Sequence, residues 1–215
     1  MRFPVINSYS LLRYGLTTIA GVLIGAFVTH LLLTSPLFIA DQTPIFEAST
    51  PIATSTGLIL EKASPLTLSI PAINLNTSFT GELGLNQDGT VEVPDNYSEV
   101  GWYKYGPTPG ELGPAVILGH VDSFKGPAVF YDLRKVDIGD QIFIDRSDGT
   151  SAIFTVTEIE TAAEENFPTN RVYDSTINYA GLRLITCTGS FDRLNQRYNH
   201  NLIIYAKLTA LENDF

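Results

Sequence analysis

Two residues that together can perform acyl transfer each end an apolar run. Cys187, the only cysteine among the 215 residues, closes the run LITC, and His120 closes the run VILGH in the same way. A thiol beside an imidazole is the minimal equipment for nucleophilic acyl transfer, because the imidazole can move the proton of the thiol. Since both residues stand where a strand would end, the pattern favours a nucleophile and an acid/base at the rim of a sheet.

Each of these residues also has a structural interpretation when it is taken alone. A free cysteine is among the most buried residue types and usually packs as a small hydrophobe. A lone histidine after an apolar run is more often a satisfied structural side chain than a base. The occurrence of Cys187 and His120 together, each at the end of an apolar run, favours the functional interpretation.

The alternation of LRLITC predicts how the thiol is presented. In a strand, Ile185 and Cys187 would lie on one face and Leu182, Leu184 and Thr186 on the other. One face can then be core while the other meets a groove. His120 lies 67 residues earlier (187 minus 120), so it reaches the thiol only if VILGH forms a nearby strand of the same sheet.

Acyl transfer also requires charge stabilisation where the tetrahedral oxyanion develops. Arginine suits this task because it stays charged and offers several donors in a fixed fork. Two arginines follow the cysteine: Arg197, just before the last predicted strand, is the favoured candidate, and Arg193 is the fallback, which otherwise reads as a solvated loop charge. The backbone N–H of Thr188, directly after the thiol, is a natural second oxyanion donor.

Composition limits the class of protein. With 44% hydrophobic and 17% charged residues, the chain can bury one substantial core. The net charge is −10, and residues 41–215 hold 11 Lys/Arg (13 minus Arg2 and Arg13) against 23 Asp/Glu. This acidity argues against a nucleic-acid partner. The sequence has neither a Cys/His zinc cluster nor an EF-hand spacing, so we expect no metal and no cofactor.

An uncharged stretch near the N terminus predicts a membrane anchor. Residues 14–40 lack any charge and contain the apolar run GLTTIAGVLIGAFVTHLLL, which is long enough to span a bilayer. The run exceeds the usual core of a cleaved signal peptide, and no small-x-small cleavage site follows it. Because both arginines of the first 40 residues precede the span, the positive-inside rule predicts a cytoplasmic N terminus at residues 1–13.

The remainder of the chain is then expected outside the cell, as part of a single-pass protein of the cell membrane. Residues 41–65 are rich in Ser, Thr, Pro and Ala without a sustained period, which is typical of a stalk. The LIL run at Leu58 to Leu60 has an alternative role, packing onto the following domain. That domain is expected to cover residues 66–211.

From Leu66 onward, short apolar runs broken by Gly, Pro, Asn and Asp predict an all-β closed barrel with short helices. The helices are expected at Val129 to Arg134 and Ser175 to Tyr179. The expected strands are Leu66 to Ile70, Asn76 to Phe79, Ala115 to Gly119, Gln141 to Asp145, Ala152 to Glu160, Leu182 to Cys187 and Leu202 to Leu208.

Four segments together resemble the sortase family, and most closely the class F sortases. They are SIPAINLN (69–76), VGWYKYGPTPGELGPAVILGHVDSFKGPAVFYDL (100–133), FPTNRVYD (167–174) and LRLITCTGSFD (182–192). The resemblance implies an eight-stranded sortase β-barrel and a cysteine transpeptidase that cleaves Leu-Pro-x-Thr-Gly sorting signals through a thioacyl intermediate. Its partners would be surface proteins that carry such signals and a peptidoglycan or pilin amine as acceptor.

Carried onto this sequence, the resemblance implies Cys187 as nucleophile, His120 as acid/base and Arg197 as substrate and oxyanion stabiliser. Thr186, Thr188 and Asp122 are the expected substrate-binding residues, with a turn role as the alternative for Asp122. The chain departs from the family at the arginine, because many sortases have it at the start of the last strand, where this chain has Asn201 preceded by His200.

Two further functions fit the same residues. A cysteine hydrolase would use water instead of an amine as acceptor, and an inactive surface-binding barrel would retain His120 and Cys187 without chemistry.

Overall fold

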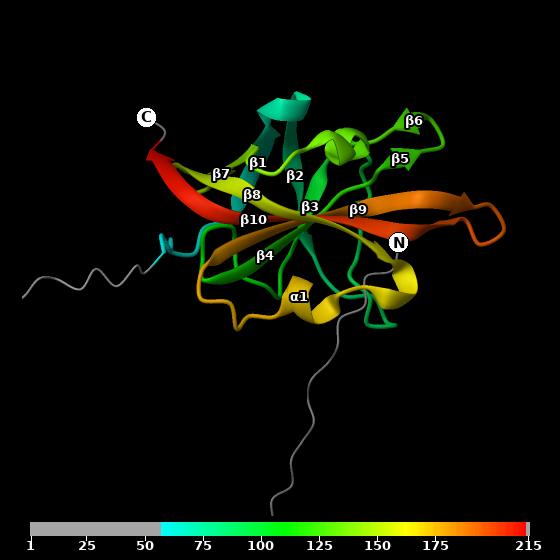
Figure 1. Ribbon diagram of the computed structural model, residues 1–215. Coiled ribbons are helices and arrows are strands. Elements are labelled where there is room, and N and C mark those ends of the chain that lie inside the picture. Colours follow the sequence, from blue (N-terminus) through cyan, green and yellow to red (C-terminus); the bar gives the residue numbers. More distant parts are fainter. Residues whose placement is uncertain (1–56, 214–215) are drawn as a thin grey trace, which may run out of the picture. The chain divides into compact units, whose positions relative to one another are not determined.

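Eight strands close into one barrel, in the spatial order β1-β2-β3-β4-β9-β10-β8-β7 (Figure 1). The structure is a computed structural model that describes residues 57–213. This closed eight-stranded barrel confirms the expected architecture. The strands are β1 (Pro65–Ile70), β2 (Leu75–Leu83), β3 (Val100–Tyr103), β4 (Gly113–Leu118), β7 (Gln141–Arg146), β8 (Thr150–Ala163), β9 (Ala180–Asp192) and β10 (Arg197–Asn213).

The remaining elements are short. A small hairpin of β5 (Asp122–Ser123) and β6 (Gly126–Pro127) follows β4, and α1 (Thr169–Tyr173), the one α-helix of the described residues, belongs to the connection from β8 to β9. Three 3₁₀ turns are η1 (Pro71–Ile73), η2 (Tyr131–Lys135) and η3 (Glu164–Asn166). The expected anchor (14–40) and most of the expected stalk lie outside the described residues. Within the described part, no helix is long and apolar enough to cross a bilayer.

Apolar side chains form two buried layers, one inside the barrel and one on its outer face. The inner layer draws on all eight strands and includes Leu182 and Leu184 of β9. The outer layer includes Ile185 of β9 and is covered by Val172 of α1. The predicted alternation of β9 is therefore confirmed, and both faces of this strand are buried along most of its length.

The strand predictions were better than the helix predictions. All seven expected strands fall on observed ones, and β3 was not expected, since its four residues are too few to show a period. The helix expected at Ser175 to Tyr179 was wrong. There, the Asp174 side chain accepts hydrogen bonds from the N–H and hydroxyl of Thr176, a local turn that competes with helix formation.

The segment before β1 lies along the barrel. Leu60 packs against the inner core cluster, and its N–H donates to the carbonyl of Gly110. Further on, Arg146 of β7 donates to the carbonyl of Glu61, and the Ala63 N–H donates to the Thr108 hydroxyl. Within the LIL run, Leu60 thus takes the packing role that was the alternative to a free stalk, whereas Leu58 and Ile59 are exposed.

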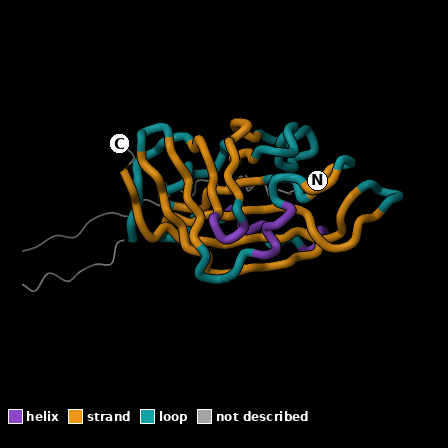
Figure 2. Tube along the Cα trace, turned by 90° about the horizontal axis from the view of Figure 1, so that it is seen from above, coloured by secondary structure: helices purple, strands orange, loops and turns teal. Residues whose placement is uncertain are grey.

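The hairpin formed by β9 and β10 extends from the barrel at the end opposite to where β10 finishes (Figures 1 and 2). The last pairing of β10 with β8 is His200 with Ala163, whereas its pairing with β9 continues to Arg197 with Asp192. Beyond His200 the two strands of the hairpin therefore pair only with each other.

Candidate active site

Parallel pairing of β4 with β9 brings His120 and Cys187 together. The register aligns Leu118 with Ile185, and the Gly119 N–H donates to the Ile185 carbonyl at 3.2 Å, one residue beyond β4. His120 and Cys187 each follow this aligned pair by two residues. Neighbouring strands lie about 4.8 Å apart, so two segments distant in sequence deliver the imidazole and the thiol to one place.

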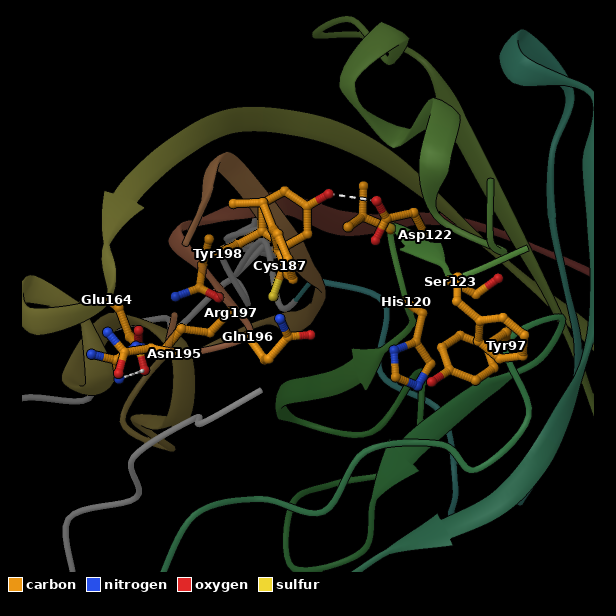
Figure 3. A pocket seen from close by; sticks show the side chains of 14 residues that line it. Tyr97, His120, Asp122, Ser123, Glu164, Cys187, Asn195, Gln196, Arg197 and Tyr198 are labelled. Atoms are coloured by element: carbon orange, nitrogen blue, oxygen red, sulfur yellow. Dashed lines mark hydrogen bonds and ion pairs between the residues drawn. The ribbon is translucent and has the colours of Figure 1, made fainter. Parts of the chain in front are cut away.

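Both side chains border one open cavity of about 820 Å³ (Figure 3). Its walls come from the segment after β4, the β5–β6 hairpin, the β8–β9 connection and the β9–β10 hairpin. The lining residues are Tyr97, His120, Val121, Asp122, Ser123, Phe124, Glu164, Cys187, Phe191, Asn195, Gln196, Arg197, Tyr198 and Asn201. Among the described residues no group of three or more His, Cys, Asp or Glu is arranged to hold a metal ion.

The imidazole of His120 is held on two sides. Its Nε2 lies 2.7 Å from the carbonyl oxygen of Pro94, and its ring centroid lies 4.3 Å from that of Tyr97. Because a carbonyl oxygen can only accept, Nε2 must carry the proton in this hydrogen bond. In the neutral imidazole Nδ1 is then the nitrogen without a proton, and it is the atom that can act as a base.

Cys187 is a buried thiol that just reaches the cavity. Cys187 is 8% exposed, and burial raises the pKa of its thiol to about 11. The negative charges of Glu164 and Asp122 act in the same direction. The resting thiol is therefore protonated at neutral pH, so attack on a carbonyl requires a base that removes its proton.

The other expected substrate-binding residues next to the thiol do not border the cavity. Thr186 is 1% exposed, its hydroxyl has no hydrogen-bond partner, and it shares the inward face of β9 with Leu184. Thr188 is half-buried and pairs with His200. Directly opposite Cys187, β10 contributes Asn201, which is 4% exposed and does border the cavity.

Arg197 borders the cavity but contacts a carboxylate on its wall. Its Nη1 lies 3.2 Å from Oε1 of Glu164, and its side chain is 51% exposed (Figure 3). On β10, Arg197 pairs with Asp192 of β9, whereas Asn201 pairs with Cys187. Arg197 therefore lies four residues, or about 13 Å along the strand, from the position opposite the thiol. The fallback, Arg193, lies in the exposed turn of the hairpin and does not border the cavity.

Asp122 has a partner across the cavity. The hydroxyl of Tyr198 donates to its carboxylate at 2.5 Å, which joins β10 to the β5–β6 hairpin (Figure 3). This hydrogen bond raises the pKa of Tyr198 to about 12. Asp122 thus ties the two walls that carry His120 and Cys187.

Sequence reasoning missed several residues of the site. Pro94 and Tyr97 lie in the irregular segment between β2 and β3, where no periodicity or spacing marks a contact with His120. Tyr198 had one usable signal, its position beside the proposed Arg197. Glu164 had none, because its contact with Arg197 spans 33 residues.

Comparison with known proteins assigns the family. Residues 68–209 match the sortase domain family. This chain belongs to the sortase family. Sortases are cysteine transpeptidases that act on sorting signals, which agrees with a thiol and an imidazole at one cavity.

Solved sortase structures share the fold. The lid mutant of Streptococcus agalactiae sortase C1 is 21% identical, with a TM-score of 0.52 over 71% of this chain and 72% of that one. Listeria monocytogenes sortase A is 20% identical, with a TM-score of 0.53 over 72% of this chain and 92% of that one. The Clostridium perfringens sortase D5 transpeptidase is 20% identical, with a TM-score of 0.50 over 69% of this chain and 79% of that one. At these identities the likeness establishes the sortase barrel alone. No curated protein sequence matched the chain.

Proposed function

We propose that this sortase is a membrane-anchored enzyme of class F type that cleaves Leu-Pro-x-Thr-Gly sorting signals and transfers the acyl group to a cell-wall or pilin amine. The observation that supports the proposal is the parallel pairing of β4 with β9, which ends two residues before His120 and Cys187, together with the one cavity that both residues border. The class F assignment rests on the four sequence segments that resemble that class.

In the first step, Sγ of Cys187 attacks the threonine carbonyl carbon of the sorting signal, and the thiol proton moves to Nδ1 of His120. The tetrahedral intermediate then collapses as the imidazolium returns that proton to the departing amine. A thioester on Cys187 remains. The acceptor amine attacks this thioester, loses its proton to His120 and releases the thiol.

We propose that Arg197 and the backbone N–H of Thr188 stabilise the oxyanion. The ion pair with Glu164 opposes this role of Arg197 only weakly, because an exposed ion pair contributes only about 0.2–1 kcal/mol of stabilisation. The larger obstacle is the distance along β10 between Arg197 and the position opposite Cys187. It requires the end of the hairpin to bend toward Cys187 when the sorting signal binds.

The remaining assignments complete the proposal. Asp122 contacts the substrate or orients the wall that carries His120, and Thr186 and Thr188 shape the site around the thiol. We further propose a cytoplasmic segment (1–13), a transmembrane anchor (14–40), a stalk (41–65) and an extracellular catalytic domain (66–211).

Mass spectrometry of the full chain, incubated with a library of sorting-signal peptides and an amine acceptor, tests this proposal. The expected results are a thioacyl adduct on Cys187, a ligated peptide product, and loss of both in Cys187→Ala. Cleavage without ligation, when the amine is in excess, would identify a hydrolase. A wild-type protein that neither cleaves any peptide nor reacts with an alkylating reagent would identify an inactive barrel.

A further inference from the structure

A second pocket lies on the same outer face of the barrel as Cys187. Its volume is about 300 Å³, and its walls come from β8, β9, β10 and the segment around α1. Arg183 of β9 borders this pocket and precedes Cys187 by four residues on the same face of the strand, about 13 Å away along it. The lining residues are Thr157, Glu158, Asn170, Arg171, Asp174, Ile177, Tyr179, Arg183 and Tyr205.

Arg183 is a buried cation without a counter-charge. Arg183 is 3% exposed, its Nη1 donates only to the neighbouring Leu182 carbonyl, and its Nε has no hydrogen-bond partner. The guanidinium carbon lies 4.7 Å from the centroid of the Tyr205 ring. No carboxylate of residues 57–213 forms an ion pair with it. Burying a cation is costly unless an anion pairs with it, and a ring face compensates only in part.

Arg146, the other deeply buried arginine of residues 57–213, shows how the same barrel pairs such a charge. It is 2% exposed, but its guanidinium donates to the Glu61 carbonyl and the Thr150 hydroxyl and lies 3.4 Å from the Asp148 carboxylate. Arg183 has no equivalent of Asp148. Residues 57–213 therefore supply no anionic partner for Arg183.

The surroundings of Arg183 favour a ligand at this position. Arg171, the second arginine of the pocket, already pairs with Glu158 at 2.8 Å and Glu160 at 2.7 Å, which leaves Arg183 as the unpaired cation. A side chain at residue 181 would begin 3.0 Å from Nη1 of Arg183 and 2.9 Å from Cδ1 of Ile177, so Gly181 allows the backbone to pack closely against the guanidinium.

The rim of the pocket limits the charge of the ligand. Asp174 and Glu158 border the same pocket, and Asp174 pairs with no cation of the described residues. The unpaired carboxylate of Asp174, at the rim of a protein with a net charge of −10, disfavours a polyanion. It favours a ligand that carries a positively charged group as well as a negatively charged one. A volume of about 300 Å³ also lies at the small end for ligand pockets.

We propose that this pocket binds a small zwitterion of the amino-acid type. Its carboxylate accepts hydrogen bonds from Arg183, and its ammonium group lies toward Asp174. The η3 and α1 segment borders this pocket through Asn170 and the cavity of Cys187 through Glu164, so a bound ligand would stabilise a wall common to both. This binding is independent of any chemistry at the thiol.

Saturation-transfer NMR on the full chain in detergent micelles tests the site, in a Cys187→Ala background that prevents thioester formation. Free alanine is the main probe, and acetate and methylammonium each supply one of its charged groups. We expect transfer to alanine, weaker transfer to acetate, and a loss of alanine affinity of roughly tenfold or more in Arg183→Met. Arg134→Met is the matched control, because Arg134 also stacks on a ring, that of Tyr131 at 4.3 Å, but lies outside the pocket.

A second variant keeps the test decisive if Arg183→Met does not fold. Asp174→Asn changes an exposed residue, and it should weaken alanine binding while leaving acetate binding unchanged. The proposal is overturned if no probe receives saturation from the wild-type chain, or if Arg183→Met binds alanine as well as the control does. It is also overturned if inorganic phosphate, followed by ³¹P line broadening, binds through Arg183 while alanine does not.

Discussion

Cys187 and Arg197 lie on the same hairpin but in different surroundings. Cys187 is 8% exposed and lies where β10 still pairs with both β8 and β9. The side chain of Arg197 is 51% exposed, beyond a register irregularity between Tyr198 and His200, where only two strands remain paired. Two-stranded segments are marginally stable. The sheet therefore fixes the thiol, whereas the place of the guanidinium depends on how the hairpin end bends.

The largest loss of activity is expected at the Cys187 end of the hairpin, which the sheet holds in place. His120→Ala should lower kcat/KM by roughly 10²–10⁴, because the thiol is protonated at rest and the variant has no group to remove its proton. His200→Ala is the control, since His200 lies one strand position beyond the residue opposite Cys187 and does not border the cavity. Equal losses in the two variants would contradict a specific role for His120. Peptide cleavage followed by chromatography measures both.

At the exposed end of the hairpin, Arg197→Ala should lower kcat/KM by roughly 10²-fold, the usual scale for loss of one oxyanion donor. Glu164→Gln should raise activity a few-fold, because it frees Arg197 from its ion pair. Arg193→Ala is the control and should change little. A larger loss in Arg193→Ala than in Arg197→Ala would assign the charge stabiliser to the turn of the hairpin instead.

The pH dependence of alkylation tests the burial of the thiol. The raised pKa favours the neutral thiol, so the thiolate fraction should grow about tenfold per pH unit from pH 7 and level off only near the pKa of about 11. The measurement is the rate of iodoacetamide labelling of Cys187, read by mass. A plateau below pH 8 would show a thiolate stabilised by its surroundings and would reverse the proposed order of proton transfer.

The smallest effect is expected at the bond that joins the two walls. Tyr198→Phe and Asp122→Asn should each lower kcat a few-fold with little change in KM, because both weaken the tie between the hairpin and the segment after His120. If the hydrogen bond is the cause, the double variant should lose no more than the larger single loss. Fully additive losses would show that the two residues act separately.

The sequence predicts the barrel and the chemical pair for different reasons. Seven strands show as apolar runs between turn residues, and the inward and outward faces of β9 follow from simple alternation. The closed barrel also follows from this pattern of short runs, whereas the number of its strands is implied only by the resemblance to sortases. The parallel register of Leu118 with Ile185 cannot be read from either run, since it depends on the packing of the whole barrel.

The parts that sequence reasoning missed are contacts without a local pattern. The Pro94 carbonyl holds His120 through a backbone atom, so no residue type marks it. The contact of Arg197 with Glu164 and that of Tyr198 with Asp122 depend on how far each hairpin reaches. Arg183 stood in the middle of an apolar run, where the sequence offered no indication that its charge would be buried and unpaired.

The central claim is that Cys187 carries the acyl group. Intact-mass and peptide-mapping spectrometry of the full chain, quenched during incubation with a Leu-Pro-x-Thr-Gly peptide, measures this directly. The account predicts a mass increase equal to the acyl fragment on Cys187, lost in Cys187→Ala and accumulating when no amine is added. Turnover of the peptide by Cys187→Ala, or an adduct on any other residue, would contradict it.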